Sequence, residues 1–473
     1  MKAVVLGAGP AGMTAALHLA ERGADVTVVD RHPFVGGAAA SQPIGDGHER
    51  MDFGPHAFHL KDPDINKVFL HYAGGDVSRK HRNERILVRG CLFRYPLEIG
   101  EVLSHLSFGH VLWMGAAFAL ARTRFRLLPR PDTDFEAWGV NRFGRPLYDF
   151  TCGKYTEKVW GVRPSRLSAK LAQQKLKDLR LRDLLAKILG GRGQEHKQYW
   201  EDYAYPPEGI GVVFENMAKR ICELSGRVIL AAPLARVLAD SRRARAITVR
   251  HSDGSEEEIR CDLLINTVPL THLASALERG DSHLAIPSAN GLRYRGLVLI
   301  NVVFNLDQVV PFDWVYLLDE VFRCNRFTEQ KNMGGKMIPP GKTVLCFELG
   351  ASPGDAFWEA SDKALFQVAL DDIRNIGFMA PSRIERFHVA RLEDAYPMYS
   401  LDFDERLNSV IQTLARTENI FTIGRQGLFL NNDVHDSMQM GKLAADISVA
   451  GRGTSEWYTF ATDYIRGRIE GSR

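Results

Sequence analysis

The stretch KAVVLGAGPAGMTAALHLAERGADVTVVD at positions 2–30 decides the fold of this chain. The apolar run at 2–6 predicts a strand, the glycine-rich turn GAGPAG at 7–12 follows it, and residues 13–23 have the apolar spacing of a helix. A second predicted strand ends at Asp30. Strand, tight turn, helix and strand in this order are typical of a Rossmann-type dinucleotide-binding fold.

Three glycines of the turn, Gly7, Gly9 and Gly12, match the GxGxxG pattern. Glycine permits the tight turn and a close approach of the backbone, and the following helix directs unpaired N–H groups at a pyrophosphate. Asp30 is placed to accept hydrogen bonds from a ribose hydroxyl, and its charge would repel the 2'-phosphate of NADP. These residues alone leave NAD and FAD open.

Two further glycines, Gly36 and Gly37, follow shortly after Asp30. This pattern resembles the glutathione-reductase-like class of flavoproteins, and it favours FAD as the cofactor. We therefore expect an FAD-binding protein.

The length of 473 residues exceeds what one hydrophobic core usually supports. We predict an α/β fold in which a Rossmann-type, glutathione-reductase-like FAD-binding domain carries a helical insertion and a second, sheet-containing substrate domain. The predicted boundaries are 1–90 with 205–285 and 390–465 for the discontinuous FAD-binding domain, 91–204 for the helical domain, and 286–389 for the substrate domain.

Composition narrows the classes of partner and site. The net charge of +3 is too small to indicate nucleic acid as a partner. The six cysteines form no CxxC pair, so we expect neither a metal site nor a disulfide framework. Met1 leads directly into the first predicted strand without the features of a secretory signal, and we expect a cytoplasmic protein.

A mostly apolar segment runs from Val102 to Ala121 and is followed by four arginines, at 122, 124, 126 and 130. Such a segment is typical either of a helix at a membrane surface or of a buried helix in a large domain. Polar residues interrupt the segment, and we do not expect peripheral membrane contact.

Several blocks then resemble one enzyme family in the right order along most of the chain. They are DFGPHAFH at 52–59, FRYPL at 93–97, YTEKVWG at 155–161, YPPEGIG at 205–211, AYPMY at 395–399 and GRQGLFLNNDVHDSMQMG at 424–441. Together they resemble the UDP-galactopyranose mutase branch of the flavin amine oxidase superfamily, which also contains the protoporphyrinogen oxidase group.

The resemblance implies an isomerase whose reduced flavin N5, and not a side chain, attacks the anomeric carbon of a nucleotide sugar, with NAD(P)H as a candidate external reductant. The alternative is an FAD-dependent oxidase or desaturase that removes hydride from a small or lipophilic substrate. In that case the apolar segment from residue 102 could line an entry tunnel. The residues do not separate these two activities.

The same resemblance implies further contacts to FAD. His56 would lie beside the isoalloxazine, Arg425 would contact a phosphate, and the backbone at Val237 would meet the adenine. A helix expected to begin near Asp436 or Ser437 would direct its positive end at the flavin pyrimidine. Gly424, Asp433, Ser437 and Met438 complete the predicted cofactor residues.

For the substrate, the resemblance assigns diphosphate binding to Arg326 and Tyr396, with Tyr155 and Lys175 as weaker candidates. His56, Arg326 and Tyr396 are the predicted catalytic group. Arginine suits this task because its planar fork binds phosphate in a bidentate manner. Lys175 stands where the mutases carry a second arginine, so that contact would be a point charge. A surface salt bridge for Arg326 and a core hydroxyl for Tyr396 are the alternatives.

Asn431 and Asn432 also depart from the family pattern, because they stand where many relatives place an aromatic residue.

Overall fold

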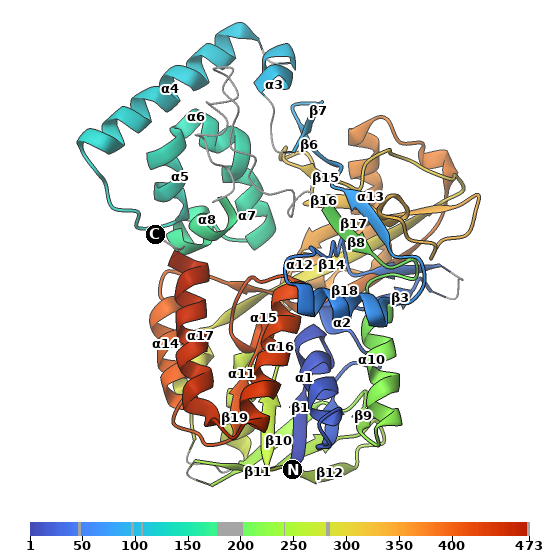
Figure 1. Cartoon of the computed structure of the whole chain (residues 1–473). Coiled ribbons are helices and arrows are strands. Elements are labelled where there is room, and N and C mark those ends of the chain that lie inside the picture. The colour runs from blue at the N-terminus through green and yellow to red at the C-terminus, as the bar shows by residue number, and fades with distance from the viewer. Residues whose placement is uncertain are drawn as a thin grey trace.

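The computed structural model describes residues 1–45, 49–95, 99–105, 107–176, 202–240, 242–280 and 284–470 (Figure 1). Two large sheets organise these residues. One is the predicted Rossmann sheet near the N-terminus, and the other forms the middle of the molecule in Figure 1. A group of helices lies beyond the second sheet, at the top left of the view.

The Rossmann sheet contains five parallel strands in the order β19-β13-β1-β2-β9. Their bounds are Ile420–Thr422, Leu263–Asn266, Lys2–Leu6, Asp25–Val29 and Arg227–Ile229. The predicted opening of strand, turn, helix and strand is confirmed, with helix α1 at Pro10–Ala20 between β1 and β2. Helices α10 (Gly211–Glu223) and α16 (Val434–Val449) pack against α1, and they cover the same side of the sheet (Figure 1).

The second sheet has seven strands in the order β18-β14-β17-β16-β15-β6-β7. Their bounds are Ile384–Met398, Arg293–Phe304, Thr343–Gly350, Arg326–Glu329, Trp314–Leu317, Glu84–Val88 and Cys91–Arg94. The predicted border at residue 390 therefore falls inside β18, and the border at residue 90 falls in the turn between β6 and β7 of the same sheet. Apolar periodicity predicts strands, but it carries no information on which distant strands pair, and so the borders were set by sequence order alone.

Smaller sheets complete the strand content. Strands β10 (Leu234–Ala239), β11 (Ala244–Arg250) and β12 (Glu256–Arg260) form an antiparallel sheet, in which β11 and β12 make the hairpin predicted around SDG. Two pairs are β3 (Ser41–Pro43) with β4 (Arg50–Asp52), and β5 (Ser78–His81) with β8 (Asp202–Tyr205).

The remaining helices outside the helical region are α2 (Pro63–Ala73), α11 (Leu270–Arg279), α12 (Ala356–Glu359), α13 (Asp362–Ile376), α14 (Phe403–Leu414), α15 (Gly424–Gly427) and α17 (Gly453–Glu470). Helix α13 packs on β14 and β18 of the second sheet, and α11 packs on β10.

The predicted helical region, 91–204, begins with β7 and ends in β8, and its described residues between 99 and 176 are mostly helical. It contains α3 (Ile99–His105), α4 (Phe108–Leu127), α5 (Phe135–Phe143), α6 (Arg145–Tyr148), α7 (Lys154–Trp160) and α8 (Ala169–Leu176). The apolar segment is not the buried helix that we considered, because α5 and α6 cover only one side of α4. Met114 is its one fully buried residue in the described part. Among the described residues no helix is long and apolar enough to cross a membrane.

Candidate active site

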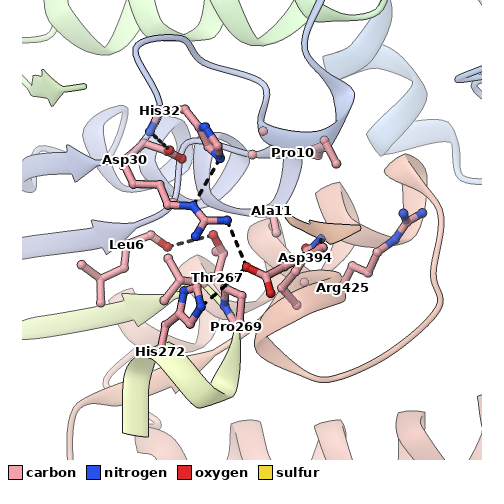
Figure 2. Close-up of a pocket in the computed structure, with 18 of the residues that line it drawn as sticks. Leu6, Pro10, Ala11, Asp30, His32, Thr267, Pro269, His272, Asp394 and Arg425 are labelled. Carbon is pink, nitrogen blue, oxygen red and sulfur yellow. Dashed lines mark hydrogen bonds and ion pairs between the residues drawn. The ribbon is translucent and has the colours of Figure 1, made fainter. Parts of the chain in front are cut away.

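A cavity of about 340 Å³ lies at the carboxyl ends of the parallel strands. Leu6 and Val29, the last residues of β1 and β2, line it together with Thr267 and Gly424, which follow β13 and β19. Ligands of open parallel sheets bind at this edge, because the strand ends and helix N-termini converge there. Figure 2 shows residues of the cavity wall drawn from these elements.

The three glycines of the turn have different structural roles. A Cβ on Gly12 would lie 2.0 Å from the carbonyl oxygen of Gly7, so this position needs glycine for internal packing. Gly7 has a φ of +101°, which other residues rarely adopt. Gly9 borders the cavity, and the nearest atom to its Cβ would be the Gly36 carbonyl oxygen at 4.0 Å. Gly9 therefore leaves free space, of the kind that a pyrophosphate at the start of α1 requires.

Asp30 also lines the cavity, as predicted for a ribose contact. Its carboxylate already accepts hydrogen bonds from the backbone N–H of Ala8 at 2.7 Å and of His32 at 2.8 Å. These bonds fix the carboxylate at the end of β2, as Figure 2 shows for His32. A carboxylate has about four acceptor positions, so lone pairs remain for ribose hydroxyls.

An ionic cluster borders the cavity next to Asp30 (Figure 2). Arg31 forms ion pairs of 3.0 Å with both Glu393 and Asp394 of β18, and His272 lies 3.6 Å from Asp394. Burial raises the pKa of Asp394 and lowers the pKa of His272. The cluster joins the end of β2 to the second sheet and so holds the two walls of the cavity together.

Some predicted cofactor residues lie outside the cavity wall. Gly12 and Gly36 support it from behind, and the N–H of Gly36 donates to the Ala8 carbonyl at 2.8 Å. Val237 and Met438 are fully buried and do not line the cavity. The strand that carries Val237 begins three residues earlier at Leu234, which lines the cavity together with Ala232 and Pro233 just before it. The contact of the Val237 backbone with the adenine therefore stays a prediction, and Leu234 is the residue of this strand that borders the cavity.

Helix α16 begins at Val434, two or three residues before the predicted start. Asp433 is the N-cap, and its backbone N–H donates to the Asp436 carboxylate at 3.1 Å in a capping box. Asp433, Val434 and Ser437 line the cavity, so the positive end of the helix borders the space where a flavin would lie.

Arg425 lines the same cavity, but backbone carbonyls hold its guanidinium. Its Nε and Nη2 donate to the Asn432 carbonyl at 3.0 and 2.7 Å. The guanidinium carbon lies 5.4 Å from the centre of the Tyr396 ring. Arg425 therefore links the cavity to the second sheet, where Tyr396 lies in β18.

His56 lines the cavity near these residues, and its Nε2 is buried without a hydrogen-bond partner among the described residues. Burial, with the nearby positive charges of Arg425 and Arg326, lowers its pKa to about 4. The imidazole is therefore neutral at physiological pH. An unpartnered buried nitrogen indicates a missing polar neighbour, and the polar edge of an isoalloxazine fits that need.

Arg326 lies at the start of β16 and pairs with Glu348 of β17. Its Nε donates to the Glu348 carboxylate at 2.5 Å, and its guanidinium carbon lies 6.0 Å from the Tyr316 ring centre. Burial alone would lower the pKa of Arg326, but Glu348 raises it well above its usual value. In the described part of the chain only Nε is engaged, which leaves both Nη groups for a ligand.

Tyrosines surround Arg326. Tyr316 contacts Tyr155 and Tyr95, with ring centres 6.1 and 5.7 Å apart. Tyr396 packs edge-on against Trp160 at 6.3 Å. We call Tyr95, Tyr155, Tyr316, Tyr396 and Arg326 the tyrosine cluster.

The sequence blocks indicated Tyr155, Tyr396 and Arg326, but we did not single out Tyr316, Tyr95 or Glu348. Tyr316 could have been found, because the stretch WVYLLDEVFRCNRF at 314–327 contains both Tyr316 and Arg326, and the two residues face each other in the β15–β16 hairpin.

The side chain of Lys175 lies outside the described residues, although the backbone of α8 that carries it is described. The neighbouring Gln174 donates from Nε2 to the Asn431 carbonyl at 3.1 Å. The end of α8 therefore lies beside the loop that precedes α16.

Several solved structures share this fold. A reduced UDP-galactopyranose mutase matches with a TM-score of 0.81 and 19% identity, covering 100% of this chain and 98% of that one. A putative protoporphyrinogen oxidase from Exiguobacterium sp. 255-15 matches with a TM-score of 0.70 and 16% identity, over 95% and 98% of the two chains. A putrescine oxidase bound to putrescine matches with a TM-score of 0.60 and 16% identity, over 95% and 99%.

A search of curated protein sequences returned no match. The family model described as flavin containing amine oxidoreductase matches residues 10–446, which is most of the chain. This match agrees with the space at Gly9, the unpartnered His56 and the first turn of α16 around one cavity. The chain therefore belongs to the flavin-containing amine oxidoreductase family and is an FAD-dependent enzyme.

Proposed function

We propose that this enzyme, with reduced FAD bound, interconverts the pyranose and furanose forms of a sugar attached to a nucleoside diphosphate. The observation that carries the proposal is Arg326, whose guanidinium lies beside the Tyr316 ring while Glu348 holds Nε. A guanidinium fixed on one side presents its remaining donors to a diphosphate in a bidentate manner.

Bound reduced FAD would supply the nucleophilic N5 for attack on the anomeric carbon. The chain would contribute charge and orientation. The N-terminus of α16, whose residues Asp433, Val434 and Ser437 line the cavity, favours negative charge at that edge. The neutral His56 is suited to a hydrogen bond without a competing positive charge.

The departing nucleoside diphosphate needs its negative charge stabilised as the bond to the sugar breaks. Arg326 supplies a fixed positive charge, because Glu348 orients its guanidinium before substrate binds. Tyr155, Tyr316 and Tyr396 offer hydroxyl donors and ring faces around it. We propose that Tyr396 and Arg326 hold the diphosphate, with Tyr155 and Lys175 in supporting roles.

An FAD-dependent oxidase of a small amine or a lipophilic molecule is the second candidate. Glu348 favours it, because this carboxylate offsets the charge of Arg326 inside the cluster. The positive charges of Arg326 and Arg425, which together lower the pKa of His56, act against a cationic amine at the same place. We therefore prefer the anionic substrate.

The test is turnover under argon. The FAD-loaded protein is reduced with dithionite and incubated with UDP-galactopyranose and with other UDP- and dTDP-sugars, and the products are separated by chromatography. We expect a furanose product only from the reduced enzyme. Arg326→Ala should abolish it, while Arg323→Ala, an exposed arginine three residues earlier, should not. Hydride removal from an amine with oxygen consumption, and no isomerised sugar, would establish the oxidase instead.

A further inference from the structure

Helix α4, Phe108–Leu127, lies along the outer edge of the helical region, at the top left of Figure 1. Its inner side packs on α5 and α6. Met114 is buried there, and the Arg142 guanidinium lies 5.0 Å from the Phe125 ring centre. Packing on this inner side therefore already covers one apolar stripe of the helix.

The outer side is apolar as well, which an ordinary surface helix is not. Among the described residues, thirteen large apolar side chains are exposed, and six of them lie between residues 108 and 128. They are Phe108 (77% exposed), Leu112 (60%), Trp113 (57%), Leu120 (70%), Leu127 (74%) and Leu128 (68%). A helix that is apolar all round is normally buried, so a gathering of this size indicates a surface that is covered in use.

The charges around this surface have one sign. Between Glu101 and Asp132 the sequence contains no acidic residue, and it contains four arginines. Arg124 and Arg126 are exposed in the last turn of α4, and Arg130 is exposed three residues after its end. The occupant that complements apolar side chains flanked by arginine is a layer with a hydrocarbon interior and an anionic surface.

We propose that α4 docks this enzyme on the surface of a bilayer that contains anionic lipid. The helix would lie in the plane of the interface, with Leu112 and Leu120 inserted and Trp113 at the level of the headgroups, where tryptophan is enriched. The arginines would contact lipid phosphates. A second copy of the chain fits this surface less well, because two such faces bring no opposite charges together.

The surface also continues toward the active site. Trp113 lines a depression of about 350 Å³ whose wall includes Tyr155, a member of the tyrosine cluster. Docking through α4 would therefore bring a bilayer next to the side of the enzyme on which that cluster lies. The proposal does not depend on which reaction the cluster performs.

Sedimentation with vesicles tests the docking. The purified FAD-loaded full chain is mixed with sucrose-loaded vesicles of phosphatidylcholine, or of equal parts phosphatidylcholine and phosphatidylglycerol, at low and high salt. We expect binding to the mixed vesicles that weakens at high salt. The triple variant Arg124→Gln, Arg126→Gln, Arg130→Gln should lose about a hundredfold in affinity for them.

A second triple variant, Leu112→Gln, Trp113→Gln, Leu120→Gln, removes the inserted side chains and should lose about a hundredfold as well. The matched control is Phe378→Gln with Leu401→Gln, which changes exposed apolar residues outside α4 and should bind as the unchanged protein does. Retained flavin absorbance verifies folding.

The proposal would be overturned if the wild-type protein bound neither kind of vesicle. It would also be overturned if the α4 variants bound as tightly as the control. Light scattering measures whether a second copy of the chain covers this face instead. If the wild type binds no vesicles but forms an oligomer that the α4 variants do not form, the face is a contact between copies and the proposal is overturned.

Discussion

The cofactor cavity and the tyrosine cluster adjoin each other but are built differently. Backbone forms much of the cavity wall, through the glycine turn at 7–12, the strand ends of one sheet and the first turn of α16. The cluster consists of side chains from α7, β15, β16 and β18, together with Tyr95, which directly follows β7. A site made of backbone persists through many substitutions, whereas a site made of side chains changes with each one. The difference explains how relatives can share a cofactor fold and act on different molecules.

Electrostatics separates the two regions further. The cavity meets helix N-termini, whose partial positive charge comes from the backbone, and the Arg31 ion pairs border it at the end of β2. The cluster contains a full ion pair between Arg326 and Glu348. We therefore expect substitutions in the glycine turn of the cavity to act through lost space, and substitutions of Arg326 or Glu348 in the cluster to act through lost charge.

The largest expected effect tests the backbone-built cavity. Gly9→Val should give folded protein that lacks flavin, because its side chain points into space that only a ligand needs. We expect near-complete loss of flavin absorbance at 450 nm, read as about zero bound FAD per chain. Gly115→Ala, at an open helical position, is the control. A normal flavin content in the Gly9 variant would contradict the assignment of the pyrophosphate position.

The next effect tests the ion pair of the cluster. Arg326→Ala should lower the free energy of unfolding by about 3 to 5 kcal/mol, because it leaves a buried carboxylate unpaired. Adding Glu348→Gln to that variant should restore part of the loss, since it removes the unpaired charge. Urea unfolding of the two single variants and the double variant measures the coupling. Additive effects would mean that the pair is not coupled.

A smaller expected effect is the contribution of His56 to the pH dependence of folding stability. The folded pKa of His56 is about 4 and the ordinary value is 6.5, so between these values the unfolded chain binds more protons. Stability that is present above pH 6.5 is therefore lost as the pH falls toward 4. When the pH is lowered, the free energy of unfolding of His56→Gln apoprotein should fall by about 1 to 2 kcal/mol less than that of wild-type apoprotein. His81→Gln, at an exposed histidine, is the control, and identical acid profiles for wild type and the His56 variant would contradict a buried neutral imidazole.

The smallest effect concerns the hydroxyl of Tyr396. Tyr396→Phe keeps the ring against Trp160 and Arg425 and removes only a hydrogen-bond group. We expect an unchanged melting temperature and a loss of about 1 kcal/mol in UDP affinity. Tyr399→Phe, a buried tyrosine in the same block, should leave UDP affinity unchanged. Equal UDP affinity in wild type and the Tyr396 variant would leave this residue a packing role only.

The same contrast decided what the sequence could predict. Gly7, Gly9, Asp30 and Gly37 were found because the cofactor turn is local, with every contributing residue within a short stretch. Glu348 was missed because it meets Arg326 only through the pairing of β16 with β17, and strand pairing is not visible in apolar periodicity. The family blocks supplied Arg326 and Tyr396, yet nothing in them indicated that a carboxylate holds the arginine.

Smaller misses have similar causes. Leu234 was not named beside Val237, because alternation predicts a strand but not where it enters a cavity. The start of α16 was set too late, because Asp433, Asp436 and Ser437 are all good N-cap residues and only the capping box selects the first. The exposure of α4 was not predicted, because an apolar sequence is the same whether one side or both sides are covered.

Calorimetric titration of the FAD-loaded protein with UDP tests the central claim most directly, since the proposed function requires Arg326 to bind a diphosphate. We predict saturable binding to the wild type, weaker by about 2 to 3 kcal/mol in Arg326→Ala and unchanged in Arg323→Ala. No heat of binding in the wild type, or equal affinities in all three proteins, would contradict a nucleotide diphosphate at the tyrosine cluster.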